Sequence, residues 1–109
     1  MNNLSIAEAL REAMVEEMER DETVFCIGED IGIPGGFGGA FTATLDLEKR
    51  FPDRMLNTPI AELGFTGVAI GAAMMGMRPI ADVQYADFLF LPMDQIVINA
   101  SKMRYMSGG

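Results

Sequence analysis

One glutamate lies where a polar segment gives way to an apolar run, and it is the first candidate for chemistry in this sequence. Glu62 follows Thr58-Pro59-Ile60-Ala61 and precedes a run that contains Leu63, Phe65 and Val68. Because Pro59 disfavours helix at Thr58 and a helix can start just after it, Glu62 is expected in a first helical turn. The carboxylate then either stabilises the helix N-terminus, by ~0.3–1 kcal/mol, or binds a nitrogen of a ligand. Residue chemistry alone leaves both interpretations open.

A second pair of acids follows a short apolar run. Thr23–Ile27 is continuous and rich in β-forming residues, which predicts a buried parallel strand that ends at Gly28. Glu29 and Asp30 then lie at its carboxyl end, where ligands collect in open α/β sheets. The alternative is a pair of solvated loop acids. The glycine-rich segment 34–39 lacks the lysine of a Walker loop and the full dinucleotide spacing, so we expect a flexible turn there.

Composition narrows the kinds of chemistry. The 109 residues include 16 acidic and 8 basic side chains and no histidine, for a formal net charge of −8. This balance argues against nucleic acid or an anionic membrane as partner. Without histidine, serine and cysteine triads lack their base, and zinc-type sites have little support. No apolar run reaches membrane-spanning length, so we expect an intracellular, cytoplasmic protein.

The single cysteine has a simple interpretation. Cys26 lies inside the apolar run and has no second cysteine to pair with. A reducing compartment and a small core side chain therefore explain it better than a nucleophile does.

The expected elements alternate between helix and strand. Ser5 and Glu8 form a capping-box pattern, and Ile6, Leu10, Met14 and Met18 repeat every four residues on one helix face. The expected helices cover 6–20, 44–51, 61–75 and 93–106, and the expected strands 23–27, 55–57 and 78–85. In the last helix we expect inward positions at Ile96, Val97, Ala100, Met103 and Tyr105. This order predicts an α/β fold with a parallel sheet, in one domain that looks cut short.

The helix after Glu62 carries glycines at an unusual spacing. Gly64, Gly67 and Gly71 lie three and four residues apart, on or near one face. Each costs ~1 kcal/mol relative to alanine in a helix. We therefore expect close packing against that backbone, within the fold or between subunits.

Taken together and in order, these segments resemble a known family. The chain is similar to the beta subunit of thiamine-diphosphate-dependent 2-oxo acid dehydrogenases from Ile6 to Gly109. The matching segments are Gly28-Glu29-Asp30, Asn57-Thr58-Pro59-Ile60-Ala61-Glu62, Gly67, Gly71, Arg78-Pro79, Gln84-Tyr85-Ala86-Asp87-Phe88, Asp94-Gln95-Ile96 and Arg104-Tyr105-Met106-Ser107-Gly108-Gly109. The segment 84–88 is closer to branched-chain and generic bacterial members than to pyruvate-specific ones.

The resemblance implies a fold and a set of site residues. The fold is a three-layer, mostly parallel thiamine-diphosphate-binding fold of the pyrimidine type, with residues 1–109 as one partial domain. Glu62 would be the catalytic glutamate, which hydrogen-bonds a ring nitrogen of the aminopyrimidine and so activates the cofactor. Phe88 would lie against the pyrimidine ring, although plain core packing also explains it. The remaining implied positions are cofactor-binding at Glu29, Ile60, Ala61 and Gln84, and substrate-lining at Tyr85.

The resemblance also implies cofactors and partners. These are thiamine diphosphate, magnesium held by an alpha subunit, a second beta subunit in an alpha2beta2 heterotetramer, the acyltransferase core, and a small 2-oxo acid. Such beta subunits carry a later histidine, and their alpha subunits a glycine–aspartate–glycine motif, neither of which is present here. We therefore expect this chain alone to be inactive. A non-catalytic assembly domain, or an α/β module for another small ligand, remains an alternative.

Overall fold

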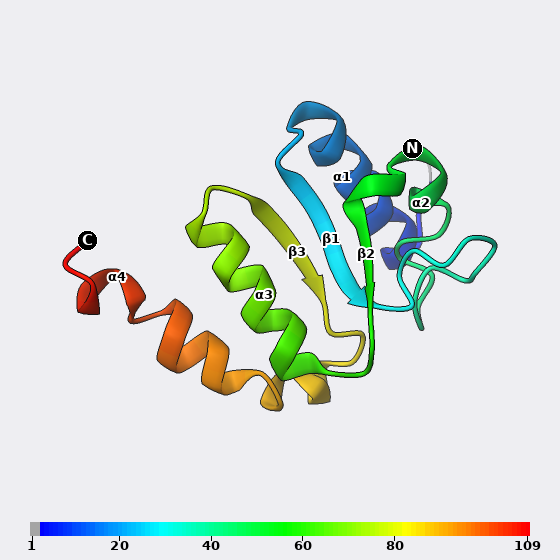
Figure 1. The fold of residues 1–109 in the computed structure, drawn as a ribbon. Helices are drawn as coiled ribbons and strands as arrows, with labels where there is room; N and C mark the ends of the chain where they lie inside the picture. The colour runs from blue at the N-terminus through cyan, green and yellow to red at the C-terminus, as the bar shows by residue number, and fades with distance from the viewer. Residues whose placement is uncertain (1–2) are drawn as a thin grey trace.

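The computed structural model describes residues 3–109 as a parallel sheet with helices on both faces (Figure 1). The elements in chain order are α1 (Ile6–Arg20), β1 (Val24–Glu29), α2 (Leu47–Arg50), η1 (Pro52–Arg54), β2 (Met55–Thr58), α3 (Glu62–Met74), β3 (Arg78–Asp82), η2 (Ala86–Phe90), η3 (Asp94–Ala100) and α4 (Met103–Met106). The predicted α/β fold with a parallel sheet is confirmed. Within residues 3–109, every helix is too short or too polar to cross a membrane.

The central strand organises the core. The strand order is β2-β1-β3, and β1 pairs in parallel with both neighbours, with Cys26 opposite Met55 on one side and Ile80 on the other. The buried run 24–27 alternates between two hydrophobic clusters. Val24 and Cys26 face α1, whereas Phe25 and Ile27 face α3. The continuous apolar run is therefore explained by burial on both faces, which makes the three layers.

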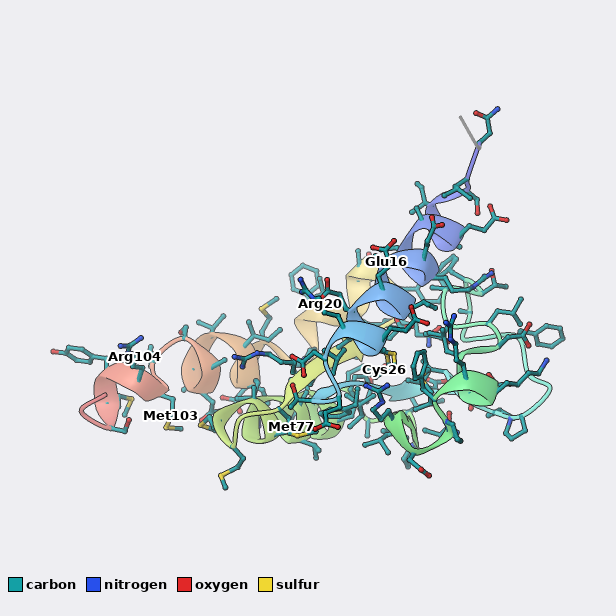
Figure 2. All side chains as sticks on the ribbon, turned by 90° about the horizontal axis from the view of Figure 1, so that it is seen from above. Glu16, Arg20, Cys26, Met77, Met103 and Arg104 are labelled. Atoms are coloured by element: carbon teal, nitrogen blue, oxygen red, sulfur yellow. The ribbon has the colours of Figure 1, made fainter. Side chains whose placement is uncertain are left out.

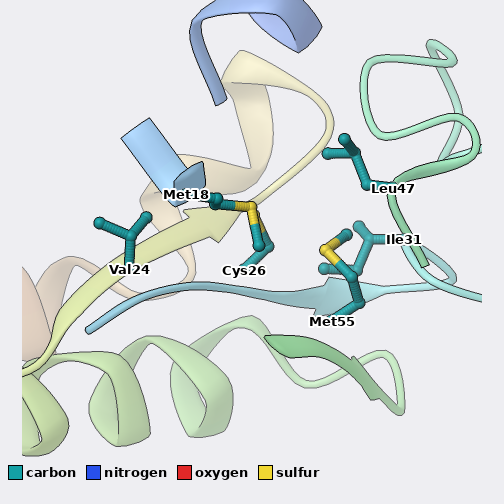
Figure 3. Packing of buried hydrophobic residues seen from close by; sticks show 6 residues of the cluster. All are labelled: Met18, Val24, Cys26, Ile31, Leu47 and Met55. Atoms are coloured by element: carbon teal, nitrogen blue, oxygen red, sulfur yellow. The ribbon is translucent and has the colours of Figure 1, made fainter. Parts of the chain in front are cut away.

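The first layer is α1, whose start follows the capping-box prediction. The Ser5 N–H donates to Glu8 Oε2 at 2.7 Å, and the Glu8 N–H donates to Ser5 Oγ at 3.2 Å. The expected apolar face is buried only toward its C-terminal end, where Met18 is 1% exposed and packs on Cys26 (Figure 3). At the other end Ile6 is 83% exposed, since the first turns of α1 extend past the sheet.

Three predicted elements are shorter than expected. The helix expected over 44–51 is limited to Leu47–Arg50, because the Thr44 hydroxyl donates to the Ile31 carbonyl and Asp46 adopts a positive φ of 63°. The strand expected over 78–85 ends at Asp82, because Gln84 has a φ of 70° and cannot continue an extended strand. The helix expected over 93–106 is divided into η3 and α4.

Four of the five inward positions expected in that last helix are also wrong, because Val97, Ala100, Met103 and Tyr105 are exposed. Ile96 is half-buried, but Val97 is 50% and Tyr105 92% exposed. The reason is that η3 packs on α3 while α4 extends beyond the sheet, and Figure 2 shows Met103 and Arg104 on this projecting part. Nothing among residues 3–109 covers the apolar side chains of α4.

Candidate functional site

The carboxyl ends of the three strands meet at one edge of the sheet (Figure 1). Glu29 at the end of β1 is level with Thr58 at the end of β2. Gly28 is level with Asp82 at the end of β3. The acids predicted at this edge are therefore placed together by the parallel register, as the sequence indicated.

A cavity of about 440 Å³ opens at this edge. One wall is the glycine-rich loop, which we define as residues 30–46, and the other is made by strand ends and η2. Its lining residues are Glu29, Asp30, Ile33, Gly36, Phe37, Gly39, Ala40, Gln84, Tyr85 and Phe88. Four predicted site residues, Glu29, Gln84, Tyr85 and Phe88, thus share one cavity.

Tyr85 and Phe88 line this cavity, and the ring of Phe41, which lies outside the lining, contacts Tyr85. The ring centroids of Phe41 and Tyr85 are 4.9 Å apart at an interplanar angle of 65°, and those of Tyr85 and Phe88 are 5.1 Å apart at 59°. Glu29 also lines the cavity, so aromatic side chains and an acidic residue are both available there to a ligand ring that carries an amine. Phe41 and the loop residues Ile33 and Phe37 were not predicted for the site. The sequence feature that could have indicated them is the presence of apolar residues in and around a glycine-rich segment, where the structure leaves them exposed.

Glu62 lies apart from these residues. It is the first residue of α3 and is 7% exposed as a whole residue, so it lies largely buried at a helix N-terminus. Within residues 3–109, no side-chain hydrogen bond is made to it. Neither Glu62 nor Ile60 nor Ala61 lines the 440 Å³ cavity, and Ile60 is 75% exposed. The structure therefore does not bring residues 60–62 into the same cavity as Phe88.

The side chain of Gln84 is already engaged within the chain. Its Oε1 accepts from the Ala40 N–H, and its Nε2 donates to the Glu29 carbonyl at 2.8 Å. The predicted cofactor-binding amide thus has protein partners on both of its polar atoms.

Cys26 is a core residue, as the sequence indicated. Its Sγ lies 3.9 Å from the Sδ atoms of Met14 and Met18, and it is 1% exposed. Burial, with a smaller contribution from the negative charge of Asp82, raises the pKa of the thiol to about 11. The thiol is therefore protonated at neutral pH and shielded from reagents. Residues 3–109 contain no group of three His, Cys, Asp or Glu side chains arranged to hold a metal ion.

An open parallel sheet with a cavity at its carboxyl edge defines an α/β ligand-binding domain. Sequence comparison gives the family: residues 2–108 match the profile described as the transketolase pyrimidine-binding domain. The chain therefore belongs to the family of transketolase pyrimidine-binding domains.

Curated relatives place the similarity more closely. The chain is 49% identical to the 2-oxoisovalerate dehydrogenase subunit beta of Bacillus subtilis, over 98% of this chain and 32% of that protein. It is 49% identical to the pyruvate dehydrogenase E1 component subunit beta of Porphyra purpurea, over 100% of this chain and 32% of that protein. The mitochondrial bovine pyruvate dehydrogenase subunit beta is 42% identical, over 97% of this chain and 29% of that protein. The chain thus spans about one third of the length of the relatives it matches.

Proposed function

We propose that this chain is the pyrimidine-binding part of the beta subunit of a thiamine-diphosphate-dependent 2-oxo acid dehydrogenase. The observation that carries the proposal is the 49% identity to such beta subunits over 98–100% of the chain. The reaction of the assembled enzyme is the oxidative decarboxylation of a 2-oxo acid, either branched-chain or pyruvate. Residues 1–109 form one partial domain of the subunit.

The aromatic lining of the cavity supports a place for one face of the pyrimidine ring; because Glu62 does not line the cavity, the proposal requires the ring to extend beyond it to the start of α3. The rings of Tyr85 and Phe88 offer a face for a flat ring, and the Glu29 carboxylate can accept from an amine. The diphosphate half does not fit, because no basic side chain of residues 3–109 lines the cavity. In the proposal, the alpha subunit supplies the magnesium ion and the groups that hold the diphosphate.

Glu62 is the proposed catalytic residue. A carboxylate at a helix N-terminus is stabilised by the helix dipole, and burial strengthens each hydrogen bond that it makes. Such a group can hold a proton shared with a ring nitrogen of the aminopyrimidine, and backbone atoms of Ile60 and Ala61 lie next to it. Bound thiamine diphosphate supplies the electron sink for decarboxylation. Tyr85 is the proposed substrate-lining residue, and its side chain is accessible, since the residue is 47% exposed.

The proposed partners follow from the same assignment. They are the alpha subunit, a second beta subunit in an alpha2beta2 assembly, and the acyltransferase core that takes the acyl group. The proposed compartment is the cytoplasm. The chain alone is inactive in this proposal, because it supplies half of the cofactor site.

The test is a titration of thiamine diphosphate and magnesium into this chain mixed with an alpha subunit of a 2-oxo acid dehydrogenase, followed by calorimetry. Wild-type chain is expected to bind the cofactor only in the mixture. Glu62→Gln is expected to lower cofactor-dependent decarboxylation by at least about 100-fold, the scale of one proton-transfer group. Glu12→Gln, at an exposed acid of α1, serves as the matched control. Full decarboxylation with Glu62→Gln would refute the assignment of Glu62.

A non-catalytic assembly domain is the second candidate. It is favoured by the outer face of α3, where Leu63 is 45% and Val68 57% exposed. Light scattering distinguishes it: association of the chain without any cofactor binding in the mixture favours assembly alone, and a stable monomer argues against it.

A further inference from the structure

The glycine-rich loop follows the carboxyl end of β1, and Gln84 is one of the side chains that hold it there. Gln84 Oε1 accepts from the N–H of Ala40 in the loop, and Gln84 Nε2 donates to the carbonyl of Glu29 at 2.8 Å. Glu29 is the last residue of β1, and Gln84 follows β3. A single amide therefore joins the segment after β3 to the end of β1 and to the following loop, which lie 55 and 44 positions away in the sequence.

The backbone of Gln84 is held in the conformation that aims this amide. Its φ of 70° is in the left-handed region, which is unfavourable for a residue other than glycine. The Gln84 N–H donates to Asp82 Oδ1 at 2.8 Å, so Asp82 stabilises the turn. Because this conformation ends β3, it also turns the chain toward the loop.

The loop contacts the side-chain amide of Gln84 closely at Gly39. Gly39 has a φ of 75°, and a Cβ built on it would lie 3.0 Å from Gln84 Nε2 and 3.1 Å from Gln84 Oε1. Such contacts are tighter than normal, so the amide packs directly on the bare backbone of Gly39. The close approach and the two hydrogen bonds are independent signs of a fitted contact.

We propose that Gln84 is a positioning residue that holds the glycine-rich loop as one wall of the cavity, and that its amide is not a ligand contact. Ile33, Gly36 and Phe37 belong to that wall, so their placement depends on the attachment of Ala40. Asp82 acts through Gln84 by fixing its turn. The effect on the cofactor rests on the proposed function, whereas the attachment of the loop does not.

The first experiment measures amide hydrogen exchange of Ala40 in the full chain. Gln84→Ala removes the acceptor, so exchange at Ala40 is expected to accelerate about tenfold. Gln84→Glu keeps an oxygen that can accept from Ala40 but loses the donor to the Glu29 carbonyl, so it should restore only part of the protection. Gln95→Ala, at the other glutamine of the chain, is expected to leave Ala40 unchanged. Equal protection in wild type and Gln84→Ala would overturn the proposal.

A second variant separates loop release from loss of the whole fold. Gln84→Gly relieves the positive φ, so global unfolding is expected to need at least as much urea as the wild type. Exchange at Ala40 should nevertheless be as fast as in Gln84→Ala, because the side chain is gone. If Ala40 were protected in Gln84→Gly, the side-chain contact would not be what fastens the loop.

Two glycine variants test the contact from the loop side. Gly39 and Gly35 have φ values of 75° and 74°, but a Cβ on Gly35 meets nothing described within 4 Å. Both alanine variants introduce a similar backbone strain, because both glycines have a positive φ. Only Gly39→Ala also pushes against the Gln84 amide, so it should accelerate exchange at Ala40 more than Gly35→Ala does. Equal effects of the two substitutions would count against the fitted contact.

The last measurement distinguishes positioning from ligand contact. In the mixture with an alpha subunit, Gly39→Ala and Gln84→Ala should weaken thiamine diphosphate binding by similar factors. Loss of binding in Gln84→Ala with unchanged exchange at Ala40 would make Gln84 a ligand contact and overturn the proposal. If wild-type chain bound no cofactor, the proposed function would fail, while the exchange measurements would still decide the role of Gln84.

Discussion

The side-chain Oδ1 of Asn57 accepts a hydrogen bond of 2.7 Å from the backbone N–H of Gly32. Asn57 belongs to β2, and Gly32 lies near the start of the glycine-rich loop. The loop is therefore held on both sides of β1, by Asn57 from one edge strand and by Gln84 after the other. These two hydrogen bonds hold Gly32 and Ala40, which flank the segment 34–39 where a flexible turn was expected.

Asn57→Ala is expected to destabilise the chain. Gly32 is buried, so loss of Asn57 leaves its N–H without a partner at a cost of about 1–3 kcal/mol in the free energy of unfolding. Urea denaturation followed by circular dichroism measures the change. Asn57→Asp keeps an acceptor oxygen and should retain most of the stability. If both variants lost the same free energy, the hydrogen bond to Gly32 would not be the cause.

Arg54→Ala is expected to lower the free energy of unfolding by about 2–4 kcal/mol. The guanidinium donates to the carbonyls of Met18 at 2.8 Å, Asp21 at 3.1 Å and Val24 at 3.2 Å, and it lies 4.7 Å from the ring centroid of Phe51. It thus joins the C-terminal end of α1 to the start of β1. Arg54→Lys should recover only part of the loss, because an ammonium cannot reproduce the planar fork of donors.

Arg50 supplies the control for Arg54. It forms an ion pair with Glu19, but both side chains are about half exposed, at 53% and 49%. Exposed pairs contribute about 0–1 kcal/mol, so Arg50→Ala should change the urea midpoint little. If Arg50→Ala lowered the free energy of unfolding as much as Arg54→Ala does, the loss of a positive charge, and not of the hydrogen bonds of Arg54, would explain both effects.

Local sequence patterns predicted the positions of most helices and strands. Backbone conformations that depend on long-range contacts could not be predicted from the sequence. The capping-box residues Ser5 and Glu8 predicted the start of α1, and the apolar run 23–27 predicted a buried strand. The place of Glu29 at the edge of the sheet followed from the strand pattern, whereas Gln84 and Phe88 were expected in the site only from the resemblance to a known family. By contrast, the positive φ of Gln84 depends on Asp82 and on the loop around Ala40, 44 positions away. No local pattern carries such a contact.

The burial of Cys26 predicts a pH dependence of stability. Its pKa is raised from the ordinary 9.0 to about 11, chiefly by burial. The unfolded chain therefore loses this proton at lower pH than the folded chain does. The stabilising contribution is fully present below pH 9 and is lost as the pH rises toward 11, by about 3 kcal/mol.

The measurement compares wild type with Cys26→Ala in urea at several pH values from 8 to 11. Alanine removes the titrating group, and other groups titrate equally in both proteins. The stability difference between the two should therefore shrink, and then change sign or flatten, as the pH rises. Parallel curves over this range would show that the folded thiol ionises as easily as the unfolded one.

Phe88→Ala is expected to weaken thiamine diphosphate binding in the mixture with an alpha subunit by about 5–15-fold. The reason is the loss of an aromatic contact worth about 1–1.5 kcal/mol. Phe88→Tyr keeps the ring and should bind nearly as well as wild type. Calorimetric titration gives both affinities, and urea denaturation of each variant shows whether the fold has changed. Unaltered affinity in Phe88→Ala would assign this ring to core packing against Tyr85 instead.

Gly71→Ala tests why α3 carries three glycines. A Cβ on Gly71 meets no atom of the described chain within 4 Å, and one on Gly64 meets Ala61 Cβ at an ordinary 3.7 Å. Only Gly67 is approached closely, with Gln95 Cδ at 3.2 Å. Close packing inside residues 3–109 thus explains Gly67 and leaves Gly71 unexplained. In the chain alone, Gly71→Ala should raise the free energy of unfolding by up to ~1 kcal/mol, because alanine is the better helix former.

If Gly71 is kept for a contact between subunits, the same substitution should have the opposite effect on assembly. The added methyl group would hold a partner helix away from the α3 backbone, so complex formation with alpha and beta subunits should weaken while the lone chain becomes more stable. Urea denaturation gives the first quantity and light scattering of the mixture the second. Gly67→Ala is the comparison, since its gain in helix propensity is offset by the contact with Gln95. A Gly71→Ala chain that is more stable and assembles normally would remove the subunit contact as the reason for this glycine.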